Sequence, residues 1–286
     1  MISFIIPFYN KHIFINECVD SLRNQISNSD EIIIIDDGSE VPLKNNFQID
    51  NLKIIRKSNG GVSSARNCGI LAAKNNYLFF LDSDDYIVDF SIEKIKSHIS
   101  SNNNAEILAF NYYRLINDIY KKNMSFNSGE LDLLSCLSKY NFPFNSSSLV
   151  VKKDFLLTKN IFFNETLTFG EDQLFWIKCC LNGSIYYINE FLSVYRYDTD
   201  LSTSVILRND VQLNVNLIKN LFKLYLEFGD KRLLKIIDQQ IFQTCKLCFL
   251  NHDFHKLRIY SRLLRNIKYR FLLYGLLLCK YFIKTI

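Results

Sequence analysis

Four short, mostly apolar runs occur in the first eighty-one residues of the chain, and helical patterns separate them. The runs cover residues 2–6, 31–35, 52–55 and 77–81. Strands that are apolar on both faces are typical of a parallel sheet covered by helices on both sides. Two sets of apolar or small residues have helical spacing: Ile15, Cys18, Val19, Leu22 and Ile26, and Val62, Ala65, Gly69, Ala72 and Ala73. This β-α-β order predicts an open α/β sheet that binds ligands at the carboxyl ends of its strands.

The pattern changes toward the C-terminus. Polar stretches at residues 102–104 and 123–128 indicate surface loops. From about Arg208 onward nearly all of the chain has a helical period, and one apolar stripe consists of Leu213, Leu217, Leu221 and Leu224. We therefore expect a boundary near Ser204. It separates an α/β domain, residues 1–204, from a helical C-terminal region, residues 205–286, that is suited to membrane association or oligomerisation.

Composition and charge favour a globular chain in a reducing compartment. Of the 286 residues, 48% are apolar, which is enough for a substantial core. The formal net charge is only +5, but Lys and Arg concentrate in the last third, which suits a partner with an anionic surface rather than a nucleic acid. The eight Cys follow no framework of spacings, and residues 1–10 lack the basic leader of a signal peptide. We expect a cytoplasmic location, with the inner face of the membrane as an alternative.

The apolar run of residues 271–279 is far shorter than the roughly 20 residues of a membrane-spanning helix, so we expect no transmembrane helix. The tail still has an amphipathic character. Basic residues flank its apolar residues 271–283: Lys268, Arg270, Lys280 and Lys284. Such a helix either lies on an anionic membrane or packs its apolar face on the helical region.

Three polar motifs follow the first three apolar runs. They are PFYN (residues 7–10), DDGS (residues 36–39) and SNGGVSSARN (residues 58–67). DDGS is equally compatible with a simple turn. The third motif opens a helix whose backbone N–H groups attract phosphate, with Arg66 as an added cation; the alternative is a loop capped by Ser63 or Ser64. Neither a dinucleotide-binding glycine pattern nor a Walker A lysine is present.

The fourth motif, FLDSDDYI (residues 80–87), places three carboxylates in four positions. Mg²⁺ and Mn²⁺ take carboxylate and phosphate oxygens and commonly use one or two protein carboxylates. Asp82 and Asp84, at i and i+2 of an extended segment, project to one side and can share a ligand. A helix cap for residues 91–101 explains one acid but not three.

These motifs, in this order, resemble bacterial glycosyltransferase family 2, which has the GT-A fold. GEDQLFW (residues 170–176) and VYRY (residues 194–197) complete the set, and the resemblance covers residues 2–204. It implies a mixed sheet with helices on both faces. The sequence departs from the family pattern in one respect, because no His follows the Tyr-Arg pair. A contribution to diphosphate binding then comes from Arg196 or from the hydroxyls of residues 202–204.

The resemblance also implies roles for single residues. Pro7 and Tyr9 pack on the nucleotide base, Asp37 contacts uracil and Arg66 helps to bind the nucleotide. Asp82 meets the ribose or the sugar, with Ser83 beside it in the donor site. Asp84 coordinates the Mn²⁺ or Mg²⁺ that bridges the diphosphate, and Asp172 is the catalytic base. Without the resemblance, Glu171 and Asp172 can also be explained as an acid pair that complements the dipole of the helix over residues 173–181.

Another cluster of potential ligands occurs later: Cys245, Cys248, His252 and His255. The surrounding period is helical, and ten residues of helix span roughly 15 Å, too far for one tetrahedral zinc site. We therefore expect Cys residues buried on a helix face and His residues at the surface.

Together these features predict a metal-dependent, inverting glycosyltransferase that uses a UDP-sugar to extend a surface glycan or glycolipid, such as a lipooligosaccharide or capsular polysaccharide. Inversion follows from the single candidate base, with no second carboxylate placed as a nucleophile. Two alternatives stay open. A sugar-nucleotide nucleotidyltransferase should have a Gly- and Arg-rich loop after the first strand, and a non-catalytic glycan-binding protein of the same fold should have lost acids from these motifs.

Overall fold

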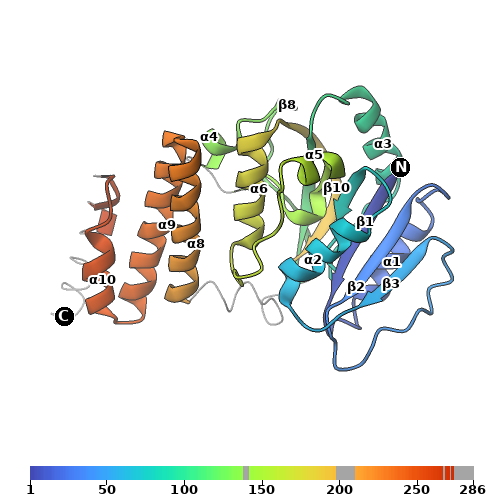
Figure 1. Cartoon of the computed structure of the whole chain (residues 1–286), viewed down its shortest axis with the longest axis horizontal. Coiled ribbons are helices and arrows are strands. Elements are labelled where there is room, and N and C mark those ends of the chain that lie inside the picture. Colours follow the sequence, from blue (N-terminus) through green and yellow to red (C-terminus); the bar gives the residue numbers. More distant parts are fainter. Residues whose placement is uncertain (138–141, 198–209, 267, 271, 274–286) are drawn as a thin grey trace. The chain divides into compact units, whose positions relative to one another are not determined.

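The computed structural model describes residues 1–137, 142–197, 210–266, 268–270 and 272–273 of the chain (Figure 1). The chain divides into two compact units, Met1–Cys136 with Tyr140–Leu201 and Leu137–Lys139 with Ser202–Ile286. The predicted boundary at Ser204 and most of the basic tail, residues 274–286, lie outside the described residues.

The first unit contains a ten-stranded mixed sheet. Its strands are β1 (Ile2–Phe8), β2 (Glu31–Asp36), β3 (Leu52–Arg56), β4 (Tyr77–Phe80), β5 (Tyr86–Ile87), β6 (Ile107–Ile116), β7 (Ile119–Lys122), β8 (Gly129–Glu130), β9 (Leu149–Lys152) and β10 (Ile185–Arg196). Their spatial order is β3-β2-β1-β4-β9-β6-β10-β5, with β7 beside β6 and β8 beside β10. The first four strands in this order are parallel, whereas β9 is antiparallel to β4 and β6. The predicted α/β architecture is thus confirmed as a mixed sheet.

Helices cover both faces of the sheet, and the alternation of side chains along β1 explains how. The helices of this unit are α1 (Ile15–Arg23), α2 (Gly61–Ala72), α3 (Ser91–Ser101), α4 (Leu133–Leu137), α5 (Lys153–Thr158) and α6 (Glu171–Asn182), with a 3₁₀ turn η1 (Ser146–Ser148). Phe4 and Ile6 share a buried cluster with Val19 of α1 and with residues of α3. Ile5 points to the opposite face and lies against Gly69 of α2.

The second unit is helical, as predicted. α9 (Lys231–Leu250) packs against both α8 (Val211–Phe228) and α10 (Phe254–Ser261) (Figure 1). Leu217, Leu221 and Leu224 of the predicted stripe are buried. The carboxylates of Asp210 and Asp230 cap the starts of α8 and α9 by accepting backbone hydrogen bonds.

The predicted continuous helix through the Cys and His residues is wrong, because the chain turns between α9 and α10. His252 has a left-handed φ of 58° there, and the carboxylate of Asp253 caps the first turn of α10. The expected burial is confirmed, since Cys245 and Cys248 are buried while His252 and His255 are exposed.

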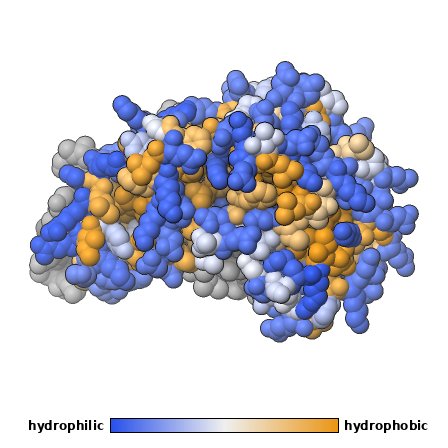
Figure 2. Space-filling model, viewed as in Figure 1, coloured by the Kyte–Doolittle hydropathy of each residue, from blue (hydrophilic) through white to orange (hydrophobic). Residues whose placement is uncertain are grey.

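No helix in the described ranges has both the length and the apolar character needed to cross a bilayer. The surface of the helical unit mixes apolar and hydrophilic side chains, and both kinds lie over α10 in the space-filling view (Figure 2).

Candidate active site

Three loops that follow parallel strands meet at one edge of the sheet. They follow β1, β2 and β4, which are parallel neighbours, so their carboxyl ends lie together. The backbone N–H of Asp37 donates to the carbonyl of the last residue of β1 (2.9 Å), and that of Asn10 donates to the Ser39 hydroxyl oxygen (3.0 Å). The first two predicted motifs therefore form one surface, on which Pro7 is buried in β1 and Tyr9 is 48% exposed.

The first acid of DDGS holds the turn. Asp36 is buried, and its carboxylate accepts hydrogen bonds from the backbone N–H of Ser39 (2.9 Å) and the guanidinium of Arg56 (2.6 Å). Burial alone would raise the pKa of Asp36, but these hydrogen bonds outweigh burial and lower it. The turn interpretation of DDGS is therefore correct for Asp36. The carboxylate of Asp37 does not take part in these hydrogen bonds of the turn.

The carboxylate of Asp37 lies at the start of α2. It accepts hydrogen bonds from the backbone N–H groups of Gly60 (3.1 Å) and Gly61 (2.7 Å). The alternative of a cap by Ser63 or Ser64 is wrong, because α2 begins at Gly61 with Gly60 in the cap position. These N–H groups thus donate to a carboxylate instead of forming an open phosphate site.

The acid-rich segment after β4 is a turn, not the extended segment that we expected. The backbone N–H of Asp85 donates to the carbonyl of Asp82 (2.9 Å). Asp85 is buried, and its carboxylate accepts hydrogen bonds from the Ser147 hydroxyl (2.5 Å) and the backbone N–H of Arg196 (2.9 Å). Burial and the charges of Asp84 and Asp82 raise its pKa well above the usual value. The third acid is therefore a structural link between β4, η1 and β10.

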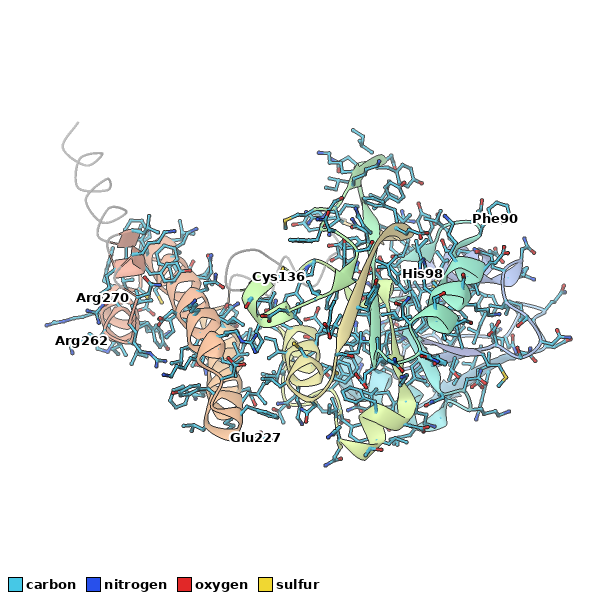
Figure 3. The ribbon with its side chains drawn as sticks, turned by 90° about the horizontal axis from the view of Figure 1, so that it is seen from above. Phe90, His98, Cys136, Glu227, Arg262 and Arg270 are labelled. Carbon is cyan, nitrogen blue, oxygen red and sulfur yellow. The ribbon has the colours of Figure 1, made fainter. Side chains whose placement is uncertain are left out.

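None of these acids caps the following helix. The cap position of α3 is Phe90, which has a left-handed φ of 61° and makes no side-chain cap hydrogen bond (Figure 3). The cap interpretation of the acid cluster is thus wrong.

Asp82 and Asp84 are the partly exposed acids of the turn. Asp84 forms an ion pair with Lys11, and Asp82 forms one with Arg66 at 2.7 Å. Their side chains are 27% exposed for Asp82 and 24% for Asp84, whereas Ser83 between them is buried. Two such carboxylates fit Mg²⁺ or Mn²⁺, which commonly bind one or two carboxylates together with phosphate oxygens and water. In the described ranges no group of three or more His, Cys, Asp or Glu residues is arranged to hold a metal ion.

Arg66 lies between the two acid motifs and is only 4% exposed. Its Nη2 lies 2.7 Å from Asp82 and its Nη1 lies 3.6 Å from Glu171, while the guanidinium stands 5.2 Å from the ring centroid of Phe163. Burial would lower the pKa of Arg66, but the charges of Asp82, Glu171 and Asp172 raise it. A buried, permanently charged cation thus connects the turn after β4 with the start of α6.

The two acids of the GED motif occupy the first turn of α6, which follows Gly170 with its left-handed φ of 71°. Burial and the charge of Asp172 raise the pKa of Glu171 to about 7, although Arg66 opposes this. Burial also raises the pKa of Asp172, while Arg66 and the backbone N–H of Gln173 (2.7 Å) oppose the increase. These partly buried acids with raised pKa values hold a proton more tightly than free carboxylates do, which a general base near neutral pH requires.

An aromatic cluster fixes α6 against β4. Phe80, the last residue of β4, contacts the rings of Phe175 and Trp176 edge-on at 6.1 Å between centroids. Phe163 stacks on Phe175 at 3.7 Å, and the side chain of Asn67 bonds the backbone carbonyl and N–H of Phe163 (3.0 and 2.9 Å). Because these residues are near the acid motifs in the sequence, their packing holds both motifs at the same edge of the sheet.

Arg196 ends β10 beside the acid turn. Its Nε donates to the carbonyl of Asp84 (3.1 Å) and its Nη2 to the carboxylate of Glu17 (2.5 Å). Its guanidinium lies 5.8 Å from the ring centroid of Tyr86, and its side chain is 18% exposed. The hydroxyls of residues 202–204, predicted as alternatives to Arg196, lie outside the described residues.

Three residues in contact with the site were not among the predicted ones. Lys11 pairs with Asp84, Lys57 pairs with Asp37 at 2.7 Å, and Asn67 holds the loop before α6. Lys11 follows PFYN directly and Lys57 follows β3, so a basic residue just after a strand was an available signal. No local pattern indicates that Asn67 bonds a residue 96 positions away.

Comparisons with known proteins agree with this geometry. Residues 3–164 match Glycosyl transferase family 2. The chain is 26% identical over 219 residues to the uncharacterized glycosyltransferase EpsJ of Bacillus subtilis, which covers 72% of this chain and 63% of EpsJ. It is 31% identical over 180 residues to the minor teichoic acid biosynthesis protein GgaB of the same organism, which covers 59% of this chain and 20% of GgaB.

Among solved structures, Staphylococcus aureus TarS (residues 1–349) in complex with UDP-GlcNAc matches with a TM-score of 0.64 and 22% identity, over 87% of this chain and 72% of that chain. This likeness confirms the GT-A fold that the order of motifs implied. This chain spans less than two thirds of the length of EpsJ and a fifth of GgaB. Since the family match extends from residue 3 to residue 164 of a 286-residue chain, more than half of it, the chain belongs to glycosyl transferase family 2.

Proposed function

We propose that this chain is a metal-dependent, inverting glycosyltransferase that moves a sugar from a UDP-sugar to a hydroxyl of a bacterial surface glycan. One observation carries the proposal: buried Arg66 contacts Asp82 of one acid motif and lies 3.6 Å from Glu171 of the other. The acid turn and the helix start that carries Asp172, the proposed base, are thus held together at the edge of the sheet where ligands of α/β folds bind. The TarS structure with UDP-GlcNAc supports a UDP-sugar as the donor.

The nucleotide half of the donor belongs over the loops after β1 and β2. Tyr9 offers an exposed ring for stacking on the base, beside the buried Pro7. Asp37 accepts hydrogen bonds at the start of α2 and offers its remaining acceptor capacity to an N–H of uracil. Arg66 is buried, so its part in nucleotide binding is to hold Asp82 toward the ribose or sugar.

The diphosphate belongs at the acid turn. Asp84, with Asp82 beside it, would hold Mn²⁺ or Mg²⁺, and the bound ion would neutralise charge on the leaving diphosphate as a Lewis acid. Lys11 pairs with Asp84 in the free chain. With a cation bound at Asp84, the Lys11 ammonium would be available to a diphosphate oxygen. Arg196 donates to the carbonyl of Asp84 and is paired with Glu17, so it adds a second cation beside the acid turn.

Asp172 takes the proton of the acceptor hydroxyl in the proposed reaction. The acceptor oxygen attacks the anomeric carbon, the bond to the UDP oxygen breaks, and the proton moves to the Asp172 carboxylate. Glu171 is directed to Arg66, and neighbouring residues at a helix start point about 100° apart, which leaves Asp172 for the acceptor. A single displacement with one base inverts the configuration at the anomeric carbon.

The acceptor is a surface glycan or glycolipid, and the helical unit favours contact with an anionic membrane. Arg258 and Arg262 are exposed next to Ile259 (47% exposed) and Leu263 (53% exposed), and Arg262 lies near Arg270 in Figure 3. Basic and apolar groups at adjacent positions are what an interfacial helix presents to lipid. The name of the relative GgaB, a teichoic acid biosynthesis protein, agrees with an acceptor of the cell surface.

Flotation with phosphatidylglycerol vesicles tests the membrane contact. Ile259→Ser with Leu263→Ser should lower recovery in the lipid fraction, whereas Leu226→Ser on α8, which is 68% exposed, should not. Equal recovery of the parent chain, the Ile259→Ser/Leu263→Ser variant and the Leu226→Ser variant in the lipid fraction would remove membrane contact from the proposal.

A panel of nucleotide-sugars, assayed for transfer and hydrolysis with Mn²⁺ and with EDTA, tests the main proposal. Calorimetry should give much weaker UDP binding in EDTA, because the diphosphate and the acid turn repel each other without a cation. The anomeric configuration of the product, measured by NMR, should be inverted. Turnover in EDTA equal to that in Mn²⁺ would exclude the metal role, and absence of any turnover over the full panel would argue against the enzyme.

A further inference from the structure

A hollow of about 690 Å³ lies next to the acid turn in the first unit. Its walls come from α1, β5, β10 and the hairpin of β6 and β7. This volume is within the range of about 300–1,000 Å³ for sites that bind small molecules. None of the site residues predicted from the sequence lines it.

Three tyrosines line the hollow: Tyr86 on β5, and Tyr113 and Tyr120 on the hairpin of β6 and β7. The hydroxyls of Tyr86 and Tyr120 lie 2.7 Å apart, and the rings of Tyr113 and Tyr120 meet edge-on at 6.4 Å. Tyr120 is 58% exposed. A tyrosine has an apolar ring face and a polar hydroxyl, so it can contact both the C–H face of a sugar ring and its hydroxyl groups.

Three carboxylates lie on other walls: Glu17 and Asp20 on α1, and Asp89 after β5. The residues that line the hollow include no Lys or Arg, so an anionic ligand is disfavoured. Glu17 is ion-paired with Arg196 and Asp20 with Arg23, which reduces the net negative charge that would attract a cation. The remaining acceptor oxygens suit the hydroxyls of a neutral ligand.

The hollow begins where the proposed donor site ends. Tyr86 is two residues after Asp84. The guanidinium of Arg196 donates to the carbonyl of Asp84 and to the carboxylate of Glu17, and it lies near the ring of Tyr86. The side chain of Arg196 therefore lies between the proposed donor site and the hollow. A ligand in the hollow is therefore adjacent to the turn that would carry the diphosphate.

We infer that this hollow binds a neutral sugar unit of the acceptor other than the one whose hydroxyl reaches Asp172, with a ring stacked on Tyr120 or Tyr113 and hydroxyls bonded to Asp20 and Asp89. This inference rests on the proposed function, because it gives the acceptor of that reaction a place. It commits to a neutral saccharide. A cationic ligand for the aromatic and acidic walls is the competing outcome of the test.

Saturation-transfer NMR on the full chain, with UDP and Mg²⁺ present, tests the inference with the methyl glycosides of glucose, galactose and N-acetylglucosamine. At least one glycoside should bind, and Tyr120→Ala should weaken its binding roughly three- to ten-fold through loss of the aromatic contact. Tyr120→Phe keeps the ring and should retain most of the binding. Ile119→Ala is the matched control, because Ile119 lies next to Tyr120 on β7, is 59% exposed and does not line the hollow.

The outcomes separate this inference from the proposed function. Glycoside binding that does not respond to Tyr120→Ala, or no binding of any glycoside, overturns the inference even if UDP binds normally. Binding of tetramethylammonium that depends on Tyr120, without glycoside binding, overturns it in favour of a cationic ligand. Failure of UDP to bind with Mg²⁺ counts against the proposed function alone, and a Tyr120-dependent glycoside signal would still establish a sugar site.

Discussion

Arg66 is the residue through which the two acid motifs influence each other. Its positive charge lowers the pKa values of Glu171 and Asp172 against the effect of burial, and their negative charges keep it protonated. At 4% exposure it has little access to solvent. Arg66 therefore acts mainly by positioning Asp82 and Glu171 and by its electrostatic effect on the pKa values of Glu171 and Asp172.

Replacing Arg66 should change the pH dependence of turnover. In Arg66→Gln the cation that lowers the pKa of Asp172 is lost, so the proposed base stays protonated to higher pH. The rise of kcat with pH should shift to higher pH, and Arg66→Lys, which keeps the charge, should shift it less. Profiles of kcat against pH for both variants measure this. A uniform loss of kcat with an unchanged profile would mean that Arg66 has only a structural role.

Glu171 should make the first unit less stable as pH rises. Its folded pKa of about 7 is above its ordinary value of 4.5, so between these values the folded state holds a proton that the unfolded state has lost. The free energy of unfolding then falls as pH rises through this window, by up to about 3 kcal/mol at about 1.36 kcal/mol per pKa unit. Glu171→Gln should remove this decrease and be more stable than the parent chain at pH 8.

Urea unfolding at pH 5 and pH 8, followed by the fluorescence of the single Trp, Trp176 on α6, measures this difference. Glu93→Gln on the exposed face of α3 serves as the control and should change little. A Glu171→Gln variant less stable than the parent chain at pH 8 would show that its ion pair with Arg66 outweighs the cost of burial.

Residue types predicted the acid sites, but their partners could not be predicted. Asp82 and Asp84 stand out because acids directly after an apolar strand have no use in a core. Their assignment to an extended segment was wrong because Asp85 turns inward to Ser147, which lies 62 positions away. Local spacing contains no information about such a partner.

Among the elements, α2 is the one that carries Arg66 and Asn67 to the site, and its distance from β1 depends on Gly69. A Cβ at this position would lie 2.2 Å from Cγ2 of Ile5. Helix periodicity grouped Gly69 with Ala65, which is buried, but it also grouped it with Val62, which is 37% exposed at the start of the helix. It could not predict that the helix begins at Gly61 on the carboxylate of Asp37, because that cap comes from another loop.

Gly69→Ala should destabilise the chain, although alanine normally stabilises a helix relative to glycine. The added methyl group would push α2 away from β1, and overpacking of this kind costs about 1–3 kcal/mol. A lower midpoint of thermal unfolding is expected, whereas Leu71→Ala on the exposed face of the same helix should change it little. A higher midpoint of thermal unfolding for Gly69→Ala would show that the space between α2 and β1 can accommodate the added methyl group.

For the whole molecule, the order of elements in the sequence predicted the parallel half of the sheet, because each strand and its helix are local. The antiparallel part, in which β9 lies between β4 and β6, joins segments far apart in the chain and has no local signature. That arrangement matters for function, since η1 leads into β9 and its Ser147 anchors the acid turn.

The central claim is that Asp172 is the general base at a donor site formed by the acid turn. Kinetics of purified, folded Asp172→Asn with its true donor and acceptor test it most directly, together with UDP affinity by calorimetry and Glu171→Gln as the neighbouring control. A positioned base contributes a factor of about 10²–10⁴, so Asp172→Asn should lower kcat by that amount, leave UDP affinity nearly unchanged and lose more than Glu171→Gln. Near-normal turnover of Asp172→Asn, or a loss confined to donor binding, would contradict the claim.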